Sequence, residues 1–126
     1  RNLLIGGTGH DVFFGGLFGG SLLIGGSTAY DNDAEALDLI LQEWSSPRSL
    51  RQRVRNLSKG QGPILGGTGI KLDTRGPDKT VFDDGQTDDL IGGVFTQDWF
   101  FAKLSSKKAN RDRVFGLSFF DELDRI

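Results

Sequence analysis

The chain has 126 residues, of which 37% are hydrophobic and 25% charged, and this composition predicts a single folded domain rather than a disordered segment. It contains no cysteine and one histidine, which excludes disulfides, thiol nucleophiles, cysteine-based zinc or iron–sulfur sites and histidine-rich metal centres. The net charge of −2 is too small to name a partner, and no apolar run approaches the roughly 20 residues of a membrane span.

Glycine pairs recur at the N-terminus of the chain. Residues 6–14 match the repeat G-G-x-G-x-D-x-U-x, where U is a large apolar residue, at every position. A degenerate unit with Ser21 in the Asp place follows at 16–24, and residues 2–5 have the pattern of the end of an earlier unit. Each x-U-x triplet predicts a short strand whose central side chain points into the core, while the glycines allow a sharp turn with inward carbonyls.

A helical pattern follows the first repeats. Asn32 or Asp33 is a suitable N-cap, and from Leu37 apolar residues recur at i, i+3, i+4 and i+7. Ser46-Pro47 predicts the start of a second helix and Lys59-Gly60 its end.

The second predicted helix is rich in arginine. No aromatic residues interleave with Arg48, Arg51, Arg53 and Arg55, so we expect a solvated face and no nucleic-acid partner. The helical insert is therefore predicted over 32–60, with loops and turns over 61–80.

The repeat pattern returns at 81–102. Asp88 begins another D-x-U-x tail with Leu90 at U, a glycine pair follows, and Asp98 and Phe100 occupy the sixth and eighth places from Gly93. Because one or two units cannot bury their own apolar faces, we expect 2–31 and 81–102 to form one stack. The residues at U should share its core, and these are Leu4, Phe13, Leu23, Leu90 and Phe100. For 103–126 the pattern predicts a basic stretch and then an amphipathic helix from Ser118.

Charge alternates in blocks along the chain. The glycine-rich blocks 2–38 and 81–98 carry Asp and Glu but no Lys or Arg, whereas 45–79 and 103–113 are basic. Two interpretations remain open: the blocks neutralise one another across the fold, or the acidic blocks hold a hard cation that offsets their self-repulsion.

The complete repeat at 6–14 resembles the calcium-binding nonapeptide repeat of RTX (hemolysin-type) secreted bacterial proteins. The order of repeats and helical insert is similar to segments of very large bacterial surface or secreted proteins. The resemblance implies a mainly β fold with a helical insertion, in which degenerate nonapeptide repeats build a short parallel β-roll or β-helix. It also implies calcium as the cofactor, a secreted or cell-surface location, and neighbouring repeats of a larger parent protein as partners. Methionine is absent, including at position 1, which agrees with a piece of a larger protein.

The resemblance also implies a ligand set. Backbone carbonyls and a carboxylate of the first repeat would form one half of a calcium site, the loop after the second unit the other half, and acidic residues of the later units would add ligands. By position these residues are Gly6, Thr8, Asp11, Gly25, Asp31, Asp88 and Asp98.

Two other classes of function agree with parts of the sequence. A carbohydrate-binding or adhesive module would use an exposed aromatic platform drawn from Trp44, Trp99, Phe100 and Phe101. A hydrolase would need two carboxylates facing a cleft, and His10 occupies a variable repeat position without visible catalytic partners. We therefore expect a structural calcium-binding module and no enzyme.

Overall fold

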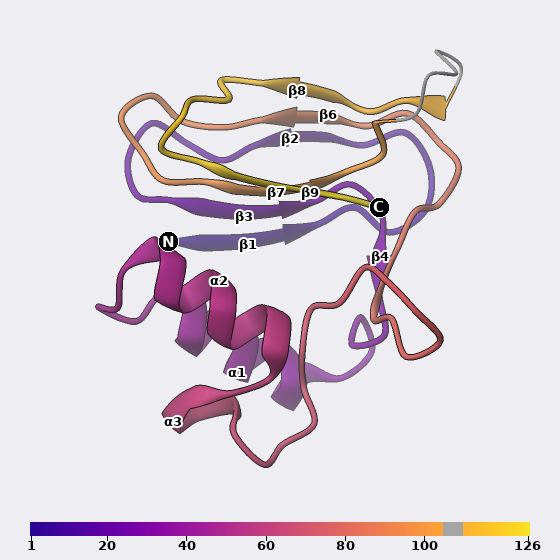
Figure 1. The fold of residues 1–126 in the computed structure, drawn as a ribbon. Coiled ribbons are helices and arrows are strands. Elements are labelled where there is room, and N and C mark those ends of the chain that lie inside the picture. The colour runs from indigo at the N-terminus through magenta and orange to yellow at the C-terminus, as the bar shows by residue number, and fades with distance from the viewer. Residues whose placement is uncertain (105–109) are drawn as a thin grey trace. The chain divides into compact units, whose positions relative to one another are not determined.

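The computed structural model describes residues 1–104 and 110–126, and these divide into two compact units. One unit consists of residues 1–27 and 82–126, and the other of residues 28–81. The fold is mixed α/β: the helices belong to a segment inserted between two strand-bearing segments of the chain (Figure 1). None of the helices in the described part of the chain is long and apolar enough to cross a membrane.

Short strands of the first unit form two sheets. One has the order β1-β3-β7-β9 and the other β2-β6-β8, and the neighbours within both sheets are parallel. Because strands that follow one another in the chain alternate between the sheets, pairing partners come from different repeats. The strands are β1 (Asn2–Ile5), β2 (Val12–Phe14), β3 (Ser21–Ile24), β6 (Asp89–Ile91), β7 (Trp99–Ala102), β8 (Arg113–Phe115) and β9 (Glu122–Arg125). A separate two-stranded sheet consists of β4 (Ser27–Thr28) and β5 (Val81–Phe82).

Both sheets contribute to the core of the first unit. Leu23, Leu90 and Phe100 are fully buried in one cluster, and Leu4 and Phe13 pack against it. The register aligns Leu4, Leu23 and Phe100 across one sheet, and Phe13 with Leu90 across the other. The prediction that the two repeat-bearing segments share one core is confirmed.

The C-terminal segment differs from the prediction. We expected a helix from Ser118, but this part of the chain forms β8 and β9, with Val114 paired to Leu90 and Leu123 to Phe100. Both strands complete a D-x-U-x pattern, so pairing with β6 and β7 satisfies the backbone and places Val114 and Leu123 against the core. A helix over residues 118–126 would have been too short to be stable without such packing. Lys107 and Lys108 of the predicted basic stretch lie outside the described residues.

The second unit contains three helices, whose ends follow local capping chemistry. Of the two predicted N-caps for the first helix, Asp33 is the one used, and its side chain accepts from the backbone N–H of Ala36. The second helix begins later than predicted, because Ser49 and Gln52 form a capping box. It ends as predicted at Gly60, which has a φ of 64°. The helices are α1 (Ala34–Trp44), α2 (Leu50–Lys59) and the short α3 (Gly62–Leu65), which lies where turns alone were predicted.

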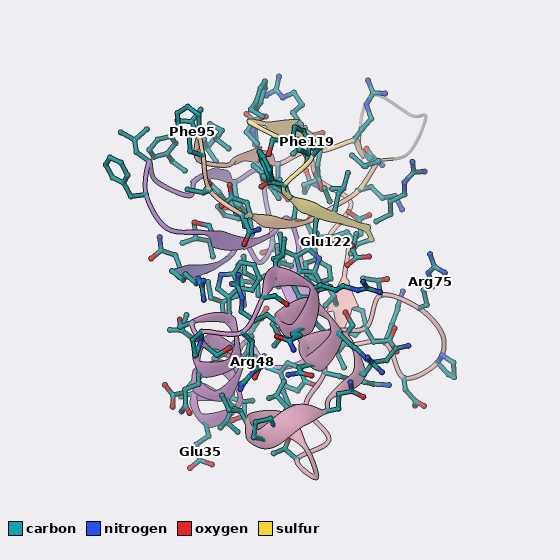
Figure 2. All side chains as sticks on the ribbon, turned by 60° about the vertical axis from the view of Figure 1, so that its left-hand side comes forward. Glu35, Arg48, Arg75, Phe95, Phe119 and Glu122 are labelled. Atoms are coloured by element: carbon teal, nitrogen blue, oxygen red, sulfur yellow. The ribbon has the colours of Figure 1, made fainter. Side chains whose placement is uncertain are left out.

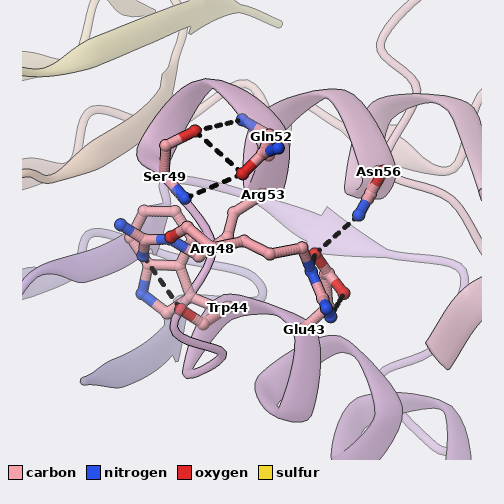
Figure 3. A network of polar contacts seen from close by, with 7 residues as sticks. All are labelled: Glu43, Trp44, Arg48, Ser49, Gln52, Arg53 and Asn56. Atoms are coloured by element: carbon pink, nitrogen blue, oxygen red, sulfur yellow. Dashed lines mark hydrogen bonds and ion pairs between the residues drawn. The ribbon is translucent and has the colours of Figure 1, made fainter. Parts of the chain in front are cut away.

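A buried polar network joins α1 to α2 (Figure 3). Glu43 is fully buried and accepts two hydrogen bonds from the guanidinium of Arg48 and one from the amide of Asn56. Arg53, which is 1% exposed, lies 4.5 Å from the ring centre of Trp44 and donates to the backbone oxygen of that residue. The prediction of a solvated arginine face was therefore wrong for Arg53, whose charge is stabilised by the aromatic ring and by carbonyl acceptors.

Candidate functional site

The segments that connect the two sheets of the first unit lie at two edges. One edge is formed by the segments that enter β2, β6 and β8. We call it the acidic edge, because it carries Asp11, Asp83, Asp84, Asp88 and Asp112. The opposite edge consists of the turns that leave these strands, at 15–20, 92–97 and 116–120, and we call it the apolar edge.

Three aspartates form a ladder along the acidic edge. Asp11, Asp88 and Asp112 directly precede β2, β6 and β8, which the parallel register aligns. Asp88 accepts the N–H of Asp11 at 2.8 Å, and Asp112 accepts the N–H of Asp88 at 2.9 Å. One oxygen of each of these two carboxylates therefore holds the backbone of the preceding unit in place.

Other carboxylate oxygens at this edge have no donor. Asp11 Oδ2, Asp83 Oδ1 and Asp88 Oδ2 are buried and have no hydrogen-bond partner among the residues that the structure describes. A Cβ built on Gly25 would lie 3.0 Å from Asp112 Oδ2 and 3.2 Å from Asp88 Oδ2, so only glycine leaves the space between that turn and the two carboxylates open. Buried carboxylate oxygens without a donor lose their hydration uncompensated, and a proton or a cation would offset this cost.

Electrostatics at the acidic edge favour the uptake of positive charge. Burial raises the pKa of Asp88 to about 6, with further contributions from the negative charges of Asp112, Asp84 and Asp11. Burial also raises the pKa of Asp112, and the charges of Asp83 and Asp84 add to this shift.

One lysine approaches this group of acids. Lys103 Nζ lies 3.7 Å from Asp83 Oδ2, at the outer limit of an ion pair. At this distance a partly exposed ammonium contributes little to neutralising Asp83.

Asp98 is the matched position on the apolar edge, directly before β7. Its Oδ1 accepts the N–H of Ser21 at 2.7 Å. Its Oδ2 accepts the N–H of Gly93 at 3.0 Å and the hydroxyl of Thr96 at 2.7 Å. Both oxygens are satisfied by protein donors, which makes Asp98 a structural residue of its turn.

The structure brings some of the predicted ligands together and separates others. Gly6, Thr8, Asp11, Gly25 and Asp88 all lie in segments of the acidic edge or directly facing it, and a Cβ on Gly6 would lie 2.7 Å from Asp11 Oδ2.

Two predicted ligands have other roles. Asp98 lies at the opposite edge of the sheets from Asp11, and both its carboxylate oxygens accept hydrogen bonds from protein donors. Asp31 caps its own loop: its Oδ1 accepts the N–H of Thr28 at 3.1 Å and the hydroxyl of that residue at 2.6 Å. The short side chain of an Asp in a tight turn bonds its own backbone readily, and this outcome is typical where the repeat spacing is lost.

Asp112 was not among the predicted ligands. It lies between Arg111 and Arg113 in a stretch that was interpreted as basic, and no glycine pair precedes it. The pattern Asp112-Arg113-Val114-Phe115 is nevertheless a complete D-x-U-x tail and would have identified both the strand and the third aspartate of the ladder.

The carboxylates of the acidic edge do not gather around one point. Within residues 1–104 and 110–126 no group of three or more His, Cys, Asp or Glu side chains is arranged so that it could hold a metal ion. What fits a hard cation is the donor chemistry, namely buried carboxylate oxygens without donors beside glycine-rich turns that can turn carbonyls toward them.

The aromatic platform of the carbohydrate-binding alternative is not exposed. Trp44, Trp99, Phe100 and Phe101 all have 0% exposure, and a sugar cannot stack on a buried ring. Comparison with family models, with curated proteins and with solved structures finds no match for this chain.

Proposed function

We propose that the chain is a calcium-binding structural module of the β-roll type, in which the acidic edge takes up calcium and thereby stabilises the strand-bearing unit. As a module of a secreted or cell-surface protein it would fold fully where calcium is plentiful and would have no catalytic activity. The parallel pairing of strands from different repeats supports this proposal, because it is the arrangement that stacked nonapeptide units require.

The observation that carries the proposal is the group of buried carboxylate oxygens without donors: Asp11 Oδ2, Asp83 Oδ1 and Asp88 Oδ2. One oxygen of Asp88 accepts a hydrogen bond from the N–H of Asp11, whereas the other is desolvated and close to the negative charge of Asp112. A divalent cation would neutralise this charge and replace the lost water.

Calcium suits these donors better than a smaller or softer ion. It takes roughly six to eight oxygen ligands in a flexible geometry, and carboxylates, backbone carbonyls and water all qualify. Asp11 and Asp88 would supply charge, and the carbonyls of Gly6 and Thr8 would add neutral ligands. A bound calcium ion would thereby hold together several turns whose negative charges otherwise repel one another.

A thermal unfolding experiment tests the proposal directly. We expect the melting temperature in millimolar calcium to exceed that in excess chelator, because a ligand bound only by the folded state stabilises it by about 2.7 kcal/mol at one hundred times Kd. Magnesium at equal concentration is the control for ionic strength and should have a smaller effect, since it demands a stricter octahedral geometry. Equal melting temperatures with calcium and with chelator would overturn the proposal.

The matched variants Asp88→Asn and Asp98→Asn locate the site. Asp88→Asn keeps an oxygen for the N–H of Asp11 but removes the buried charge, so we expect the calcium-induced rise to disappear while stability in chelator is kept or improved. Asp98→Asn removes an acceptor from Gly93 or Thr96, so we expect a loss of about 1–3 kcal/mol with and without calcium. If Asp88→Asn retained the full calcium response, the acidic edge would not be the binding site.

A further inference from the structure

The apolar edge of the first unit is the largest exposed hydrophobic feature among the described residues. The first unit has exposed large hydrophobic side chains at Val12 and at this edge. Apart from Val12, all of them lie on the turns of the apolar edge or at the last residue of β2 or β8. The exposed residues are Phe14, Leu17, Phe18, Val94, Phe95, Phe115, Leu117, Phe119 and Phe120.

Three of these phenylalanines form a row. Phe18, Phe95 and Phe119 each lie four residues beyond the last residue of β2, β6 or β8, and the parallel register aligns those last residues. Their exposed fractions are 89%, 103% and 89%, so none of the three rings contributes to the core. Figure 2 shows Phe95 and Phe119 on the same side of the strands.

The backbone at Phe95 is in an unfavourable conformation. Its φ is 59°, and among the described residues it is the only non-glycine residue with a positive φ. An aromatic residue in the left-handed region is strained, and a fully exposed ring returns no packing energy within its own chain. The strained turn therefore exposes a ring that adds nothing to the core of its own chain.

The same edge contains a hollow that fits such a ring. Its volume is about 290 Å³, which exceeds the roughly 150 Å³ cavity that accommodates benzene. It is lined by Leu17, Phe18, Gly19, Val94, Phe95 and Thr96. The next turn along the row carries Phe119 and Phe120, whose ring centres are 4.1 Å apart. The edge thus holds both a receiving surface and exposed rings.

The exposed area matches one side of a stable protein interface. A phenylalanine presents roughly 200 Å² when fully exposed, so the three rings of the row alone expose about 550 Å². The other six side chains are about half exposed and bring the total to roughly 1,000 Å². The largest apolar patch of a typical monomer is about 300–600 Å², whereas a standard interface buries about 800 Å² on each partner.

We propose that the partner at this edge is a second copy of the same chain, which packs its own apolar edge against the first in a two-fold dimer. The turns at 15–20, 92–97 and 116–120 contain no charged residue, so the surface that they expose is itself apolar and suits an equally apolar partner. A two-fold axis brings the same surface to both sides, and the exposed rings of each copy then meet the hollow of the other. The proposal does not depend on calcium binding.

The test is the mass of the intact chain in solution, measured by analytical ultracentrifugation over a range of concentrations, once in calcium and once in chelator. We expect a concentration-dependent dimer for the natural sequence in at least one of these two conditions. The triple variant Phe18→Ser, Phe95→Ser, Phe119→Ser should raise the dissociation constant tenfold or more (about 1.4 kcal/mol), while its circular dichroism stays unchanged because the three rings are outside the core. Val12→Ser, which replaces an exposed apolar residue off the edge, is the matched control and should leave the dimer intact.

A second variant separates association from folding. Phe95→Asn places a residue that tolerates positive φ at this position, so the monomer should be as stable as before or more so, while the dimer weakens. A monomer at all concentrations in both conditions would overturn the proposal, as would a dimer that the triple variant leaves unchanged. Binding of the monomeric chain to zwitterionic lipid vesicles, lost in the triple variant, would also overturn it by assigning the edge to a lipid surface.

Discussion

The two edges of the strand-bearing unit share one sequence pattern but differ in how their aspartates are satisfied. At the apolar edge both oxygens of Asp98 accept bonds from protein donors, two of which come from its own turn. At the acidic edge Asp88 accepts one bond from Asp11, and its second oxygen is buried without a donor. The same repeat position thus serves as a turn cap in one place and leaves an unneutralised charge in the other.

The local sequence explains this difference. In the turn before Asp98, Thr96 supplies a hydroxyl two residues upstream, and Gly93 supplies an N–H. In the segment before Asp88, the neighbouring side chains include Asp83 and Asp84, which add negative charge instead of donors. The identity of the preceding residues, rather than the presence of Asp in the sixth place, therefore decides whether protein donors satisfy both oxygens of the carboxylate.

The largest expected effect on the free energy of unfolding comes from Gly20→Ala, at a close backbone contact between two turns of the apolar edge. A Cβ on Gly20 would lie 2.1 Å from the backbone oxygen of Gln97, so Gly20→Ala forces two turns of this edge apart. We expect a loss of about 3 kcal/mol or more in the free energy of unfolding, equal in calcium and in chelator, measured by urea denaturation.

Gly85→Ala at the acidic edge is the comparison for this variant. Gly85 has a φ of +77°, and a Cβ added there would have no neighbouring atom within 4 Å, so only the left-handed backbone opposes the substitution, at about 1–2 kcal/mol. A larger loss for Gly85→Ala than for Gly20→Ala would show that the apolar edge is the looser of the two.

The strands of the first repeats could be predicted because their sequence pattern determines the local structure directly. Gly-Gly before D-x-U-x marks where the chain turns and which side chain faces inward, and this located Phe13, Leu90 and Phe100 in one core. Val114 and Leu123 were missed because their units have lost the glycine pair and carry arginine or glutamate around the apolar residue. Val114 directly follows the stretch that was interpreted as basic, and Leu123 was placed on an amphipathic helix from Ser118 because Phe119, Phe120, Leu123 and Ile126 also fit helical spacing.

The helical unit shows a different limit of prediction from sequence. The existence of α1 and α2 follows from apolar periodicity, but their starts depend on which of several polar residues reaches a free N–H, as with Asp33 and Ser49. The burial of Arg53 depends on Trp44, nine residues earlier, lying under its guanidinium. A linear pattern does not contain such a contact between helices.

A smaller effect is expected from Gly25→Ala, which adds one methyl group beside the carboxylates of Asp88 and Asp112. Its Cβ would lie 3.0 Å from Asp112 Oδ2 and from Leu90 Cδ1 and 3.2 Å from Asp88 Oδ2, contacts that movements of a few tenths of an ångström relieve. We expect stability in chelator to change by less than about 1 kcal/mol, since alanine also restricts the unfolded chain. Calcium affinity, measured by titration calorimetry, should fall about tenfold because the methyl group displaces the carboxylates. An unchanged affinity would place the binding site away from Gly25.

The smallest expected effect is the dependence of stability on pH in the absence of calcium. The pKa of Asp88 is raised to about 6 in the folded state by burial and by the neighbouring charges of Asp112, Asp84 and Asp11. A raised pKa means that the folded state binds the proton more tightly than the unfolded state, so the resulting stabilisation is complete below about pH 4 and is lost as the pH rises through 6. Asp112 shifts in the same direction and should add to the loss.

The measurement is the free energy of unfolding in chelator between pH 4.5 and 7.5, where we expect a decrease on the order of 1 kcal/mol, because one unit of pKa shift corresponds to about 1.4 kcal/mol and water screens part of the edge. His10 Nε2 lies 3.5 Å from Asp89 Oδ2, next to Asp88 in the chain, so the experiment is best done with His10→Gln as the common background. Asp88→Asn should flatten the profile, whereas Asp98→Asn should lower it uniformly, because this variant removes a hydrogen-bond acceptor from its turn. Calcium should abolish the decrease by replacing the proton as the source of positive charge. If the free energy of unfolding of Asp88→Asn fell with pH as much as that of the natural sequence, Asp88 would not be the source of the pH dependence. The contrast between the two edges that their hydrogen bonds indicate would then be wrong.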